Sequence, residues 1–110
     1  MIQYVIDELR SEDHEKIKTY LDQNLYFSGI GGLYWIYLDR KYLNDVQLEH
    51  MQCQPFYCAV NLKPNLIACE LLVRTAHRIQ CHCIDYTTEK QRNWLIRRIN
   101  SIFDYLEIKT

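Results

Sequence analysis

The expected architecture depends on residues 56–86, which read FYCAVNLKPNLIACELLVRTAHRIQCHCIDY. Two apolar-rich runs, 56–62 and 67–74, flank the segment 63–66, in which Pro stands second and Asn third. Those two positions favour a tight turn. A third run, 78–86, follows after a three-residue break. Short spacings between such runs are typical of antiparallel strands, so the sequence predicts a three-stranded meander.

The segments around this meander carry signals for helices and for one more strand. Helix starts are indicated by a serine before acidic residues, and twice by Asn or Thr followed three residues later by Gln. The predicted helices are 12–24 after Ser11, 45–52 after Asn44, and 88–106, which begins at Thr88. Residues 33–38 predict a strand. Residues 1–10 fit either a helix or an edge strand, because their apolar spacing suits both.

These elements together predict an α+β fold. A chain of 110 residues has the length of one domain, 1–110, and buries enough surface to fold without disulfides or metals. We expect a two-layer sandwich: an antiparallel sheet, made of the meander 56–86 and strand 33–38, with helices 12–24 and 88–106 packed on one face. Each element has one apolar face, and the two layers bury these faces against each other.

Side chains alternate along a strand, so the meander has two faces of different character. The predicted inner face is almost wholly apolar: Phe56, Cys58, Val60, Leu62, Ile67, Cys69, Leu71, Val73, Ile79, Cys81 and Cys83. The predicted outer face mixes aromatic, aliphatic and charged side chains, a composition that protein interfaces favour. Its candidate partner-binding residues are Tyr57, Asn61, Glu70, Leu72, Arg74, Arg78, His82, Ile84 and Tyr86.

This outer face favours a non-enzymatic interaction module, either a homodimer or a subunit that docks to another protein. Single-stranded RNA is the alternative ligand, because aromatic side chains and arginines on one sheet face can stack bases and contact phosphates. The net charge of −1 argues against DNA and anionic lipid, and no apolar run is long enough for a membrane helix. We therefore expect no DNA and no membrane partner.

Five cysteines without a secretion signal indicate free thiols in a reducing cytoplasm. We interpret Cys58, Cys69, Cys81 and Cys83 as small buried apolar residues, and expect neither a cofactor nor a metal. The further alternative is a metal or catalytic site. It could use Cys53 with His50, three residues apart near a helix end, although no paired Cys-x-x-Cys knuckles are present.

Two other patterns carry weaker chemical signals. A three-residue turn between the second and third strands would set Glu70 opposite His82 and Arg74 opposite Arg78; this register is left open. The first pair could act as an acid–base pair, but an ordinary surface charge pair is favoured. The glycines at 29, 31 and 32 lead into a strand rather than a helix, so we interpret them as a flexible turn and not as a phosphate loop. We assign no catalytic residue.

Overall fold

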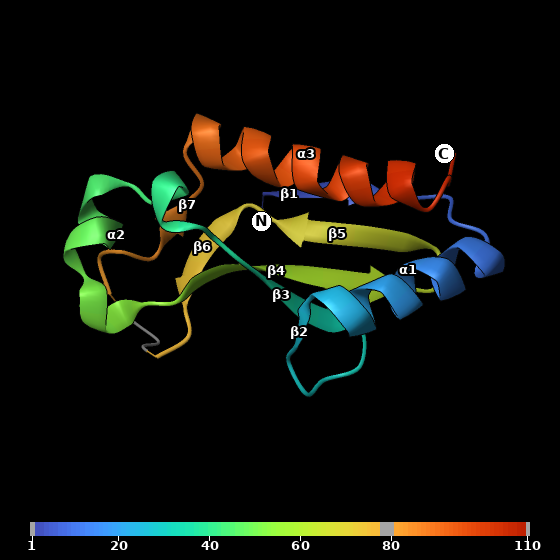
Figure 1. The fold of residues 1–110 in the computed structure, drawn as a ribbon, viewed down its shortest axis with the longest axis horizontal. Coiled ribbons are helices and arrows are strands. Elements are labelled where there is room, and N and C mark those ends of the chain that lie inside the picture. Colours follow the sequence, from blue (N-terminus) through green and yellow to red (C-terminus); the bar gives the residue numbers. More distant parts are fainter. Residues whose placement is uncertain (1, 78–80, 110) are drawn as a thin grey trace.

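The computed structural model describes residues 2–77 and 81–109, and these form an antiparallel sheet with helices on one side (Figure 1). The α+β class and the two-layer arrangement are confirmed. The elements in chain order are β1 (Gln3–Ile6), α1 (Ser11–Asn24), β2 (Tyr26–Phe27), β3 (Leu33–Tyr37), η1 (Arg40–Tyr42), α2 (Asp45–Glu49), η2 (Met51–Cys53), β4 (Phe56–Lys63), β5 (Leu66–Glu70), β6 (Leu72–Thr75), β7 (Asp85–Tyr86) and α3 (Glu89–Tyr105).

The strands follow the order β1-β5-β4-β3-β2, and β6 and β7 extend the sheet from the first half of β4. Every pairing is antiparallel. The turn predicted at 63–66 is present, since β4 and β5 pair from Lys63 and Leu66 onward. The N-terminal segment is an edge strand, because Gln3–Ile6 pairs with β5. This settles which of the two interpretations of residues 1–10 is correct.

Both long helices lie on the same face of the sheet. Pairing places Tyr4, Cys69, Val60 and Tyr34 side by side in one row across four strands. At one end of this row, the Tyr34 hydroxyl donates a hydrogen bond to Asp22 of α1. At the other end, the Tyr4 hydroxyl donates to Asn100 of α3. The row therefore belongs to the inner face; Figure 1 shows α3 along the β1–β5 side of the sheet and α1 near β3.

The hydrophobic core fills the space between the two layers. It combines the alternating inner residues of β3 to β6 with apolar side chains from both helices, and Ile17, Leu21 and Leu95 are completely buried. Burying a side chain of this size contributes roughly 1.5–3 kcal/mol relative to leaving it exposed. Cys58 and Cys69 belong to this core, as expected for small apolar residues.

The helices begin close to the predicted positions. Reciprocal hydrogen bonds between backbone and side chain confirm the capping boxes of Asn44 with Gln47 and of Thr88 with Gln91. Ser11 is itself the first residue of α1, since Arg10 occupies the cap position and its backbone N–H donates to Asp13. The predicted helix 45–52 is two short pieces, α2 and η2. In residues 2–77 and 81–109, no helix has the length and apolarity needed to cross a membrane.

The strand predicted over 67–74 is interrupted at Leu71. The backbone N–H of Leu71 donates to the carbonyl of Ile2, and its own carbonyl accepts from Thr87. Because these hydrogen bonds draw Leu71 away from β4, the register changes across it: Cys69 lies opposite Val60, whereas Arg74 lies opposite Tyr57. This change inserts two extra residues on the β5–β6 side and divides the predicted strand in two.

The prediction of a third strand over 78–86 is wrong for most of its described residues, 81–86. Among these described residues, only Asp85–Tyr86 forms a strand, while Ile84 donates its backbone N–H to the carbonyl of Cys81, closing a turn. The register with β6 sets Tyr86 opposite Leu72. The predicted opposition of Glu70 and His82 is therefore wrong. The predicted opposition of Arg74 and Arg78 falls on residues 78–80, which lie outside the described part of the chain.

Candidate metal centre

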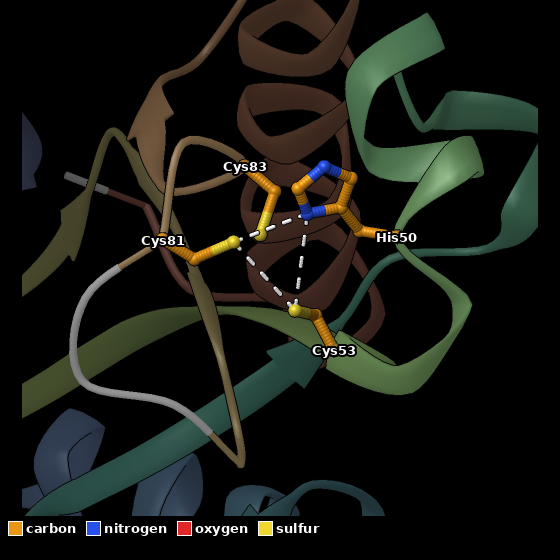
Figure 2. A group of neighbouring side chains, drawn as sticks. All are labelled: His50, Cys53, Cys81 and Cys83. Atoms are coloured by element: carbon orange, nitrogen blue, oxygen red, sulfur yellow. Dashed lines mark hydrogen bonds between the residues drawn. The ribbon is translucent and has the colours of Figure 1, made fainter.

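A cluster of one histidine and three cysteines lies where the loop before β7 meets the segment after α2 (Figure 2). His50 and Cys53 come from that segment, and Cys81 and Cys83 come from the loop. The ligand atoms of all four side chains lie within 4.8 Å of one another. Figure 2 shows the three sulfurs and the imidazole directed toward a common point. Soft sulfur and nitrogen donors in this number are typical of a zinc site.

The distances within the cluster fit a tetrahedral ion. The separations are 3.1 Å from His50 Nδ1 to Cys81 Sγ, 4.0 Å from His50 Nδ1 to Cys53 Sγ, and 3.7 Å between the sulfurs of Cys53 and Cys81. Zn–S bonds of about 2.3 Å and Zn–N bonds of about 2.0 Å place tetrahedral sulfurs about 3.8 Å apart, and sulfur and nitrogen about 3.5 Å apart. These three separations lie within about half an ångström of the tetrahedral values, and since the four ligand atoms span up to 4.8 Å, closing on zinc requires side-chain movements of up to about an ångström.

A tight turn brings His50 and Cys53 to the same side of the chain. His50 ends α2, and its carbonyl accepts a hydrogen bond from the backbone N–H of Cys53, which closes the 3-10 turn η2. Residues three apart in a 3-10 turn lie one above the other, so the imidazole and the thiol face the same neighbours. The Thr75 hydroxyl donates to the carbonyl of Cys53 and links this turn to β6.

The turn at Cys81–Ile84 directs the thiols of Cys81 and Cys83 toward His50 and Cys53. Cys81 and Cys83 were expected on the inner face of an extended strand, packed as apolar residues. Cys83 is buried, at 1 % exposure, but its thiol joins the cluster, and Cys81 is half-exposed. The interpretation as small buried apolar residues is confirmed for Cys58, Cys69 and Cys83, whereas Cys81 is only partly buried.

Ionisation separates Cys81 from the other thiols, since burial raises the pKa of its neighbour Cys83 to about 12. Hydrogen bonds with Cys83, and then with His50 and Cys53, lower the pKa of Cys81 to about 6. Burial raises the pKa of Cys69 to about 12, and it also raises the pKa of Cys58. At neutral pH the cluster thus holds an anionic sulfur, which is the form that binds metal ions. The two core thiols stay protonated.

The predicted outer-face residues are only partly brought together. Alternation along β4 to β6 sets Tyr57, Asn61, Glu70, Leu72 and Arg74 on the face opposite the helices, as expected. Glu70 accepts a 2.7 Å hydrogen bond from the Arg74 guanidinium. Of the remaining residues, Tyr86 of β7 lies opposite Leu72 of β6, and His82 and Ile84 lie in the turn before β7. Arg78 lies outside the described residues.

Three aromatic residues on this face, Tyr26, Trp35 and Tyr37, were not predicted from the sequence. Trp35 stacks against Tyr57 at 4.0 Å between ring centroids, and against Tyr26 at 5.0 Å on its other side. The edge of Tyr37 meets the ring of Tyr26 at 5.8 Å. The signal was available: in the run 33–38, alternation from an inward Tyr34 sends Trp35 and Tyr37 outward.

The convergence of His50 with three cysteines was also not predicted. Its sequence signal is a His-x-x-Cys pair followed by a Cys-x-Cys pair, and the second pair was dismissed because an extended strand would have pointed both thiols into the core. The pair of Glu70 and His82, weighed as an acid–base site, does not form. His50 with Cys53 does form, as part of a larger ligand set.

Comparisons with known proteins add no family or relative. The sequence matches no protein-family model and no curated protein, and the fold matches no solved structure. Inferences about function therefore rest on the geometry of this chain.

Proposed function

We propose that this chain is a zinc-binding domain in which His50, Cys53, Cys81 and Cys83 hold one structural Zn²⁺ ion. The observation that carries the proposal is the convergence of four nitrogen and sulfur ligand atoms within 4.8 Å. Three thiolates and an imidazole suit zinc, whereas Ca²⁺ and Mg²⁺ require oxygen ligands. Four protein ligands also complete a tetrahedron, so no position remains for a substrate, and the site is structural rather than catalytic.

The ion would stabilise the least regular part of the fold. The chain between β3 and β4 contains only short helical pieces, and the chain between β6 and α3 contains a turn and the two-residue strand β7. Zn²⁺ would cross-link these two segments, which are 28 residues apart at Cys53 and Cys81. Because the ligands converge only in the folded state, the free energy of metal binding adds to the free energy of folding.

Metal analysis of the purified protein tests this proposal. We expect one zinc per chain, and a tetrahedral thiolate spectrum after replacement by Co²⁺. Cys53→Ser and Cys83→Ser should each lower the zinc content. The control Cys58→Ala removes a thiol that lies in the sheet core, outside the cluster, and should keep full zinc content. Zinc well below one equivalent in wild type, after purification without chelators and titration with Zn²⁺, would rule the proposal out.

A second function, self-association, is favoured by the outer sheet face, defined here by Tyr26, Trp35, Tyr37, Tyr57, Glu70 and Arg74. Tyr26 and Tyr37 are 51 % and 38 % exposed, although their rings belong to a stacked cluster. Aromatic residues and arginine dominate the energetics of protein contacts. The occupant we propose is a second copy of this chain. The ion pair of Glu70 with Arg74 neutralises the charge of this face, so two copies related by a two-fold axis would not repel each other.

Sedimentation or light scattering over a range of concentrations tests self-association. Wild type should form a dimer, and the double variant Trp35→Ala, Tyr37→Glu should be a monomer. Tyr105→Glu, at the exposed end of α3, should not change the mass. A monomeric wild type at millimolar concentration would refute self-association. If single-stranded RNA binds instead, with an affinity that falls steeply with salt, the face serves nucleic acid rather than a second copy.

We place the protein in the reducing cytoplasm, where its thiols stay available for zinc.

A further inference from the structure

A pair of completely buried glutamines connects the candidate zinc centre with the start of α3. Gln47 and Gln91 are 0 % and 1 % exposed, although glutamine is mostly found at protein surfaces. Each is the third residue of its helix, where its side-chain oxygen accepts the backbone N–H of the cap residue, Asn44 or Thr88. The Gln91 amide nitrogen then donates to the side-chain oxygen of Gln47 at 3.0 Å.

The remaining hydrogen bond of Gln47 reaches the candidate zinc centre. Its amide nitrogen donates to the carbonyl of Cys83 at 3.1 Å, across 36 residues of sequence. The amide of Gln91 likewise donates to the carbonyl of Tyr42 at 2.8 Å. The two glutamines thus join the start of α2, the start of α3 and the loop that carries two of the four ligands.

We infer that Gln47 is a positioning residue of this centre, which holds the Cys83 backbone so that its thiolate faces the ion. This inference rests on the proposed zinc function and adds to it the residue that orients a ligand from outside the ligand set. Groups of this kind typically contribute a factor of 10–100 to metal affinity. The loop offers little regular structure of its own to fix Cys83, because this residue lies within the turn Cys81–Ile84 and only a two-residue strand follows.

The choice of amide over carboxylate supports this role. A capping box functions with either glutamate or glutamine at its third position. A carboxylate at 47 would still accept the hydrogen bonds from the Asn44 backbone and from Gln91. It could not donate to the Cys83 carbonyl, so this hydrogen bond favours glutamine here, as does complete burial, which disfavours a charge.

Zinc affinities of matched variants test the inference, measured by competition with a chromophoric chelator. Gln47→Glu and the uncharged Gln47→Met both remove the donor to Cys83, and we expect zinc affinity to fall about 10–100-fold. The controls Asn44→Ala and Thr88→Ala remove the caps of α2 and α3 and leave the Gln47 amide intact. They should lower thermal stability and keep zinc affinity within about threefold of wild type. With Co²⁺ bound, the Gln47 variants should show weaker thiolate absorption per ion, which lost stability alone would not cause.

A measurement on wild type keeps the inference testable if the Gln47 variants do not fold. In nuclear magnetic resonance spectra, the Gln47 side-chain amide should be protected from exchange and should shift on zinc addition. The amide of the exposed Gln52 should exchange freely. An unshifted Gln47 signal, or wild-type affinity in both Gln47 variants, overturns the inference while the zinc site stands. A wild type that binds no zinc overturns the proposed function itself.

Discussion

The sulfurs of Cys53 and Cys81 lie 3.7 Å apart across 28 residues of sequence. A disulfide needs about 2.05 Å between sulfurs, so a small movement of the half-exposed Cys81 would allow the bond. In the metal-free protein, one equivalent of hydrogen peroxide should convert these two thiols to a disulfide and be reduced to two waters. The expected readout is the loss of two hydrogens, mapped by mass spectrometry to a peptide pair containing these cysteines.

The core thiols are the internal control for this oxidation. Cys58 and Cys69 are 0 % and 1 % exposed, and burial raises the pKa of both, so they should stay reduced under the same conditions. Bound zinc should slow the oxidation, because the reactive thiolates would then be ligands. Equal oxidation of core and cluster thiols would contradict this prediction.

Removal of zinc should lower stability by an amount set by mass action. At a free zinc concentration 100 times the dissociation constant, bound metal contributes about 2.7 kcal/mol to the free energy of unfolding. Thermal unfolding with and without a chelator measures this difference. The variant Cys83→Ser should be less stable than wild type in zinc and should respond little to the chelator. An unchanged melting temperature of wild type on chelation would be incompatible with a structural ion.

Tyr34 and Asp22 should make stability depend on pH at both extremes. Burial, and then the hydrogen bond to Asp22, raises the pKa of Tyr34 to about 12. Because this pKa is higher in the folded state, the protonated phenol stabilises the fold fully below about pH 10. This stabilisation is lost as pH rises from 10 to 12. The hydrogen bond from Tyr34, and then that from Lys18, lowers the pKa of Asp22, so its contribution is lost as pH falls through about 4 and below.

Tyr34→Phe should therefore flatten both limbs of the stability profile. Chemical denaturation from pH 3 to 11.5 measures the profile, and the protein is metal-free throughout so that zinc binding does not interfere. Tyr105→Phe is the matched control, because Tyr105 is 74 % exposed and should keep the wild-type profile. Identical alkaline limbs in wild type and Tyr34→Phe would show that the phenol contributes nothing in this range.

Gly32 should tolerate no side chain, whereas Gly31 should. A Cβ at Gly32 would lie 2.6 Å from the carbonyl oxygen of Leu62, and its φ of +81° disfavours other residues. Gly32→Ala should therefore lower the free energy of unfolding by about 1–3 kcal/mol. A Cβ at Gly31 meets nothing within 4 Å, so Gly31→Ala should cost less than about 0.5 kcal/mol. Equal effects in urea denaturation would contradict the close approach of β3 and β4 at this point.

The helices and the central sheet could be predicted because their signals are local. Capping residues at Asn44 and Thr88 and the apolar period of 88–106 depend only on neighbours in sequence, and the structure confirms them. The turn at 63–66 follows likewise from proline and asparagine geometry. The inner positions of β4 follow from alternation, so Cys58 was correctly assigned to the core.

The segment 81–86 could not be predicted, because distant partners determine its conformation. Its alternating apolar residues suit a strand, but the Cys83 carbonyl is held by Gln47, and Thr87 donates to Leu71. These hydrogen bonds join residues far apart in sequence and favour a turn at Cys81–Ile84 over continued pairing with β6. The same turn directs Cys81 and Cys83 toward His50 and Cys53.

Sequence alone determined the class of the fold, its principal helices and the composition of the sheet core, since capping, turn geometry and alternation act over a few residues. Only the tertiary structure decided that His50 and Cys53 meet Cys81 and Cys83, and that Trp35 joins the aromatic face. Both outcomes depend on which strands pair and where their register changes, and those choices minimise the free energy of the whole chain rather than of any one segment.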